Sequence, residues 1–83
     1  MRAINLQGTE ITLSATPNAV SNGILIRCVI ASGTALVTRT AALGTGTTSC
    51  TVISSEPTYI FKDQSDTLTA SGSVLATSIA FMY

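Results

Sequence analysis

Turn-forming residues interrupt this chain so often that no segment has room for a long helix. Clusters of Gly, Pro, Asn, Ser and Asp separate short runs of β-forming residues at intervals of about 8–12 residues. This spacing predicts an all-β fold, a compact antiparallel β-sandwich or barrel of about seven to eight short strands, within one domain of residues 1–83. The expected strands are 2–7, 10–15, 24–31, 34–40, 47–54, 59–63, 67–70 and 74–83.

The sequence is compatible with two connections between the first two expected strands. Gly8 and Thr9 can form the turn of a hairpin, or the two segments can be one long strand with a glycine bulge.

The C-terminal third is the expected centre of the core, because it holds all four aromatic residues, Tyr59, Phe61, Phe81 and Tyr83. In the last strand the larger side chains, Leu75, Ile79 and Phe81, share one face, and we assign that face to the core. The smaller side chains would then meet solvent or a neighbouring subunit. They are Val74, Ala76, Ser78, Ala80 and Met82.

The segment 24–31 is apolar on both faces, which is typical of a central strand or of a strand whose outer face meets a partner. Ile24, Ile26, Cys28 and Ile30 alternate with Leu25, Arg27, Val29 and Ala31. Arg27 has two interpretations, a stem lying along the sheet with its guanidinium in water, or an ion pair between subunits. Together with the small face of the last strand, this gives the candidate interface residues Leu25, Arg27, Val29, Ala76, Ala80 and Met82.

Composition predicts association with other proteins. Only 10% of the residues are charged, the net charge is zero, and 83 residues make a small core. We therefore expect the chain to form a homo-oligomer or to bind a larger protein, because a near-neutral surface with few charges tends to associate. Four basic residues do not make a nucleic-acid surface, and no apolar run or leader pattern predicts a membrane segment or secretion. Synthesis in a cytoplasm is expected.

No pattern of catalytic residues is present, and we expect neither an enzyme nor a cofactor or metal site. The chain has no histidine, which excludes the Ser-His-Asp and Cys-His systems. Lys62 and Ser65 could form a Ser-Lys pair, but a solvated lysine is favoured. Asp63 and Asp66 could bind calcium, but hydrogen bonds to backbone N–H groups in an Asx-type turn are favoured.

Cys28 and Cys50 fall on separate expected strands, each with apolar neighbours. In a cytoplasmic product the pair is expected to be two buried free thiols. A disulfide across the core is the alternative.

Two stretches resemble small virion proteins of tailed phages, notably cyanophages. The first is Lys62-Asp63 with Asp66-Thr67-Leu68-Thr69-Ala70 and 74–80 (VLATSIA), and the second is 22–32 (NGILIRCVIAS), with Ala31 where Asn is typical. The resemblance covers roughly residues 21–82. It implies a structural component of a phage particle, without indicating which one.

Three roles are compatible with that resemblance. We expect a small capsid decoration (cement) protein acting by protein–protein contacts with the major capsid protein. The alternatives are a neck or tail accessory protein, or a host-surface or glycan-binding module on the virion exterior. In each case the expected location is the virion, after synthesis in the host cytoplasm.

Overall fold

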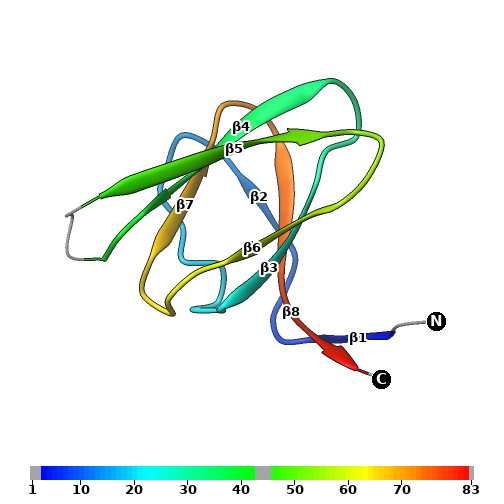
Figure 1. Cartoon of the computed structure of the whole chain (residues 1–83), viewed down its shortest axis with the longest axis vertical. Coiled ribbons are helices and arrows are strands. Elements are labelled where there is room, and N and C mark those ends of the chain that lie inside the picture. Colours follow the sequence, from blue (N-terminus) through cyan, green and yellow to red (C-terminus); the bar gives the residue numbers. More distant parts are fainter. Residues whose placement is uncertain (1–2, 43–45, 83) are drawn as a thin grey trace.

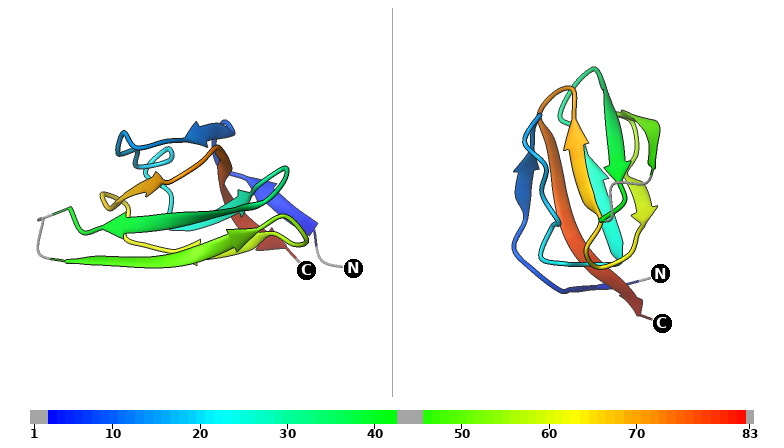
Figure 2. Two further views of the ribbon diagram at one scale, coloured as in Figure 1. Left: turned by 90° about the horizontal axis from the view of Figure 1, so that it is seen from above. Right: turned by 90° about the vertical axis from the view of Figure 1, so that its left-hand side faces the viewer.

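The computed structural model describes residues 3–42 and 46–82, with side chains up to residue 80 at the C-terminal end. It confirms the all-β class: eight antiparallel strands form two facing sheets (Figures 1 and 2). The larger sheet has the order β1-β8-β3-β6, with β2 also paired to β8, and the smaller has the order β5-β4-β7. The strands are β1 (Ala3–Leu6), β2 (Ile11–Leu13), β3 (Leu25–Val29), β4 (Thr34–Thr40), β5 (Thr47–Ile53), β6 (Thr58–Phe61), β7 (Thr67–Ala70) and β8 (Val74–Met82).

Strand β8 organises the larger sheet. It pairs with β3 on one side, and on the other side it pairs with β2 along its first residues and with β1 along its last. The expected hairpin across Gly8 is therefore wrong. The alternative, one long strand with a glycine bulge, is closer to the observed structure, because β1 and β2 lie end to end along one edge of β8. Leu6 pairs with Ile79 and Ile11 with Ala76, so residues 7–10 face only residues 77–78 and form a bulge.

The core lies between the sheets and is aliphatic. Alternate residues of β3, β4, β7 and β8 point inward and meet Leu13 of β2 and Val52 of β5. Each fully buried Val, Leu or Ile side chain stabilises the fold by about 1.5–3 kcal/mol. The largest fully buried side chains are Leu13, Val20, Ile26, Cys28, Val37, Val52, Leu68 and Val74.

The aromatic core expected from the sequence is wrong for strand β6. Tyr59 and Phe61 are 45% and 75% exposed. The cause is the pleat of the strand: Ile60 points inward and packs against the core, which turns its two neighbours outward. The side chain of Phe81 and the whole of Tyr83 lie outside the described residues.

The face expected to be core on β8 is also wrong for the first half of the strand. Val74 and Ala76 are fully buried and Ser78 is 3% exposed, whereas Leu75 is 39% exposed. Ala76 is therefore a core residue and cannot belong to an interface. Ile79 is buried, as expected, although by alternation it lies on the outer side of the strand.

A left-handed turn at residues 20–23 explains why the inner side of β8 carries a small residue at position 78. Val20, Ser21 and Asn22 all have positive φ, an unusual conformation for residues other than glycine. The side-chain oxygen of Asn18 accepts a hydrogen bond from the Val20 N–H, and the Gly23 N–H donates to the Val20 carbonyl. The turn buries Val20 and carries Gly23 against Ser78.

Candidate interaction surface

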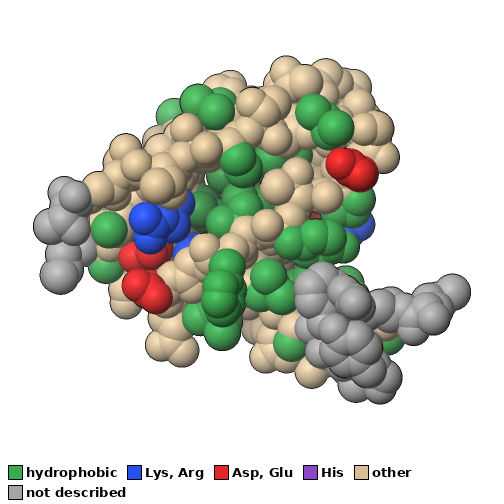
Figure 3. Space-filling view, viewed as in Figure 1, with side chains coloured by type: hydrophobic (Ala, Val, Ile, Leu, Met, Phe, Trp, Pro, Cys, Tyr) green, Lys and Arg blue, Asp and Glu red, His purple; other side chains and the backbone are tan. Residues whose placement is uncertain are grey.

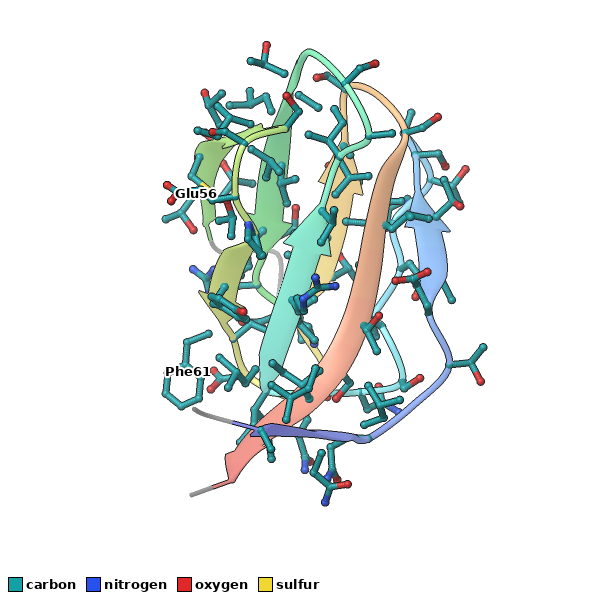
Figure 4. The ribbon with its side chains drawn as sticks, turned by 90° about the vertical axis from the view of Figure 1, so that its right-hand side faces the viewer. Glu56 and Phe61 are labelled. Atoms are coloured by element: carbon teal, nitrogen blue, oxygen red, sulfur yellow. The ribbon has the colours of Figure 1, made fainter. Side chains whose placement is uncertain are left out.

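The outer face of the larger sheet carries three rows of side chains that cross the strands. Antiparallel pairs share a face, so the printed register places Thr12, Leu75 and Val29 in one row. The next row holds Thr77, Arg27 and Tyr59, and the third holds Leu6 and Ile79 on one side and Leu25 and Phe61 on the other. Figure 4 looks onto this face, with β2, β8, β3 and β6 side by side and Phe61 projecting beyond the edge.

Several of the larger side chains on this face are uncovered, whereas Ile79 is buried. Leu6 is 66% exposed, and Tyr59, Phe61 and Leu75 are also exposed. Of the interface residues expected from the sequence, Leu25, Arg27 and Val29 lie here and are half-buried. Ala80 is half-buried at a neighbouring groove, Ala76 is in the core, and the side chain of Met82 is outside the described residues. Sequence reasoning did not find Leu6, Leu75, Tyr59 or Phe61 as surface residues.

The outer face of the smaller sheet is different in chemistry. The residues that point away from the core on β4, β5 and β7 are mostly hydroxyl-bearing, which suits a face in contact with water. They are Thr34, Leu36, Thr38, Thr40, Thr47, Ser49, Thr51, Ile53, Thr67 and Thr69. Leu36 and Ile53 are the apolar exceptions and are exposed, so the larger sheet carries more of the exposed apolar side chains than the smaller one does.

A groove of about 440 Å³ borders the contact face at the end where β1 pairs with β8. Its walls come from the left-handed turn, from the last part of β8 and from Phe61. Three amide side chains, Gln7, Asn22 and Gln64, line it together with this exposed ring.

Charged side chains gather at one end of the sandwich (Figure 3), where Arg39 and Asp66 form an ion pair of 2.7 Å. Asp66 also accepts hydrogen bonds from the backbone N–H groups of Ala42 and Asp63. Burial raises the pKa of the Asp66 carboxyl, but the hydrogen bonds from Ala42, Arg39 and Asp63 and the charge of Arg39 together outweigh it and hold the pKa below its usual value. Asp66 thus accepts hydrogen bonds from backbone N–H groups, as expected, but not in an Asx turn: it links residue 63, three positions earlier, to the distant residue 42.

Lys62 is buried at this end and is not paired with Ser65 in the described part of the chain. Its ammonium donates to the carbonyls of Asp63 and Gln64. Burial lowers the pKa of Lys62, while the charges of Asp66 and Asp63 oppose that shift. Within residues 3–42 and 46–82, no three His, Cys, Asp or Glu side chains gather where they could hold a metal ion.

The acid stability of the domain should depend on Asp66. Because its folded-state pKa lies below the unfolded value of about 3.9, its carboxylate stabilises the fold above that pH, and this stabilisation is lost as the pH falls through the folded-state pKa. Urea unfolding between pH 7 and pH 2 should show a smaller loss of stability for Asp66→Asn than for the wild type. Asp63→Asn, at an exposed position, should keep the wild-type dependence; equal curves for all three proteins would contradict the assignment.

The two cysteines are free thiols in different environments. Cys28 is fully buried, and burial together with the nearby Cys50 raises its pKa to about 12. Cys50 is exposed, which corrects the expectation of two buried thiols. Cys50 is on the edge strand of its sheet, two residues from the fully buried Val52, and it borders an open cavity beside Ile60 and Phe61 of β6, which leaves its thiol accessible.

Comparison with known proteins adds no relative: no family model, curated protein or solved structure matches this chain. No helix in the described part of the chain is long and apolar enough to cross a membrane.

Proposed function

We propose that this protein is a structural component of a phage particle, a small decoration protein that works by protein–protein contacts. The observation that carries the proposal is the uncovered apolar face of the larger sheet. Soluble monomers seldom leave large contiguous apolar patches in water, and such patches mark contact sites. Here Leu6, Tyr59, Phe61 and Leu75 are exposed on one face.

Two further features support this role. The chain has four basic and four acidic residues. Four of these eight, Arg39, Lys62, Asp63 and Asp66, gather at one end of the sandwich, where the first three line a hollow beside Phe61, which leaves few charges for the rest of the contact face. The sequence resemblance to small virion proteins points to the same kind of protein. The partner would be the major capsid protein, or a neck or tail protein if the copy number is small.

Purified particles of the phage that encodes this chain provide the test. Quantitative mass spectrometry should find the protein in the particle, with a copy number comparable to that of the major capsid protein for a decoration role. A few copies per particle would indicate a neck or tail accessory protein instead. Absence from particles that are intact and infectious would contradict the proposal.

A host-surface or glycan-binding module is the second candidate, and the groove beside Phe61 favours it. Its volume is in the range of small-molecule sites, about 300–1,000 Å³, and amide groups next to an exposed ring are suited to hydrogen bonding and stacking with a sugar. Saturable binding to isolated host glycans that is lost in Phe61→Ala, by a protein absent from the capsid shell, would favour this candidate.

A further inference from the structure

Among the side chains that the structure describes, one acidic and one basic lie on the contact face, on opposite sides of its central strand. Arg27 on β3 pairs with Thr77 on β8. On the other side of β8, the carboxylate of Glu10 accepts a hydrogen bond of 3.4 Å from the Thr77 hydroxyl. The row therefore reads Glu10, Thr77, Arg27. Among the described residues, the remaining charges lie at the end of the sandwich or, for Glu56, at its edge (Figure 4).

Neither charge on this face belongs to the ion pair of the fold, which joins Arg39 and Asp66. Arg27 is half-buried among the side chains of the sheet, and Glu10 is exposed. A half-buried guanidinium on an apolar face has lost part of its hydration, so an opposite charge arriving from a partner would be favourable.

We propose that the partner of this face is a second copy of the chain, packed face to face about a two-fold axis that runs along β8. The inference rests on the proposed function only in taking this face as the contact surface. A two-fold interface must be self-complementary, so that residue i meets residue j and j meets i. Rotation about an axis along β8 exchanges the two sides of the strand, which places Glu10 of each copy opposite Arg27 of the other.

The distances suit this arrangement. Neighbouring strands lie about 4.8 Å apart, so Glu10 and Arg27 sit at similar distances on either side of β8, and packed sheets are separated by about 10 Å, which two long side chains can bridge. The apolar residues match under the same axis. Leu75 lies on β8 itself and would meet Leu75 of the second copy, while Leu6 would lie against Leu25.

The charge pattern also selects this axis over the other face-to-face possibility. A two-fold axis running across the strands would keep each strand on its own side and, where it crosses this row, set Arg27 against Arg27 and Glu10 against Glu10. Like charges facing each other at an interface are repulsive. Of these two axes, only the one along β8 places Glu10 of each copy opposite Arg27 of the other.

Sedimentation velocity of the full chain over a wide range of concentration tests the proposal. The wild type should dimerise. Arg27→Glu and Glu10→Arg should each weaken the dimer, raising its dissociation constant by about 10- to 100-fold, because each creates two repulsive pairs. Glu56→Arg, a matched charge reversal at an exposed turn away from the row, should leave it unchanged. Circular dichroism establishes that each variant is folded.

Mixing the two weakened variants is the decisive step. A copy with Arg27→Glu has two acidic residues in the row, and a copy with Glu10→Arg has two basic ones, so together they should form a heterodimer at least as tight as the wild type. This recovery cannot arise from a contact within one chain. A wild type that stays monomeric, or folded single variants that do not recover on mixing, would overturn the proposal.

The same proteins separate this inference from the proposed function. If the wild type is monomeric but still cosediments with phage particles, the proposed dimer is wrong and the proposed structural role is supported. If the two charge-reversed variants recover a dimer on mixing but the protein is absent from particles, the dimer is supported and the structural role is wrong.

Discussion

Replacing Ala76 by lysine is expected to unfold the domain. Ala76 is fully buried between β2 and β3 and belongs to the core cluster. A lysine there would place an unpaired charge among aliphatic side chains, which costs several kcal/mol even after the protein relaxes. Small domains have a total stability of about 5–15 kcal/mol at most, so the variant should show no cooperative thermal transition by circular dichroism.

The neighbouring residue provides the matched control. Leu75 is on the other side of the same strand and is 39% exposed, so a lysine there can carry its ammonium into water. Leu75→Lys should stay folded, within about 1 kcal/mol of the wild type in urea unfolding. A folded Ala76→Lys protein, or an unfolded Leu75→Lys protein, would show that the faces of β8 have been assigned the wrong way round.

A large effect is also expected for Gly23→Ala. A Cβ at position 23 would lie 2.6 Å from the Cβ of Ser78 and closer still to its hydroxyl oxygen. Ser78 is buried in the central strand, so the backbone of the left-handed turn has to move. Overpacking of this kind costs about 1–3 kcal/mol, and here displacement of the adjoining buried Val20 adds to it. Urea unfolding should show the loss.

Two comparisons identify the cause of that loss. Gly72→Ala would bring a Cβ no closer than 3.5 Å to Ala35, an ordinary contact, so its stability should stay within about 0.5 kcal/mol of the wild type. In a Ser78→Gly background, Gly23→Ala should cost much less than in the wild type, because its main obstacle is gone. An undiminished cost in that background would mean that the contact with Ser78 is not the reason.

The strands could be predicted from the sequence because their limits are set locally. Gly33 has positive φ immediately before β4. A turn-forming residue at this position separates two strands independently of contacts with the rest of the chain. Two expected strands, 34–40 and 67–70, agree residue for residue with β4 and β7. Alternation likewise showed which residues share a face.

Which face is core could not be predicted in the same way. Alternation separates two sides of a strand but does not say which side meets the other sheet, and side-chain size was a misleading guide. On β8 the inner side chain at position 78 must be small because the turn at residues 20–23 approaches Ser78 closely. On β6 the shorter Ile60 fits inside and the rings of Tyr59 and Phe61 are left outside.

Contacts between distant segments were also beyond the sequence. The pairing of Arg39 with Asp66 joins residues 27 positions apart, and it exists only because β4 and β7 are neighbours in the smaller sheet. The position of Glu10 in the same row as Arg27 could not be predicted from the sequence for the same reason. Their common row depends on β2 and β3 lying on opposite sides of β8, which nothing in the local pattern indicates.

We propose that the protein works through the apolar outer face of its larger sheet. If it is a phage structural protein, cosedimentation with purified phage particles that lack it tests this role, using Leu75→Lys on that face and Thr51→Lys on the outer face of the smaller sheet. Both positions are exposed, so both variants should fold. We predict that Thr51→Lys binds particles like the wild type and that Leu75→Lys does not. Full binding by folded Leu75→Lys would show that this face is not the one through which the protein binds.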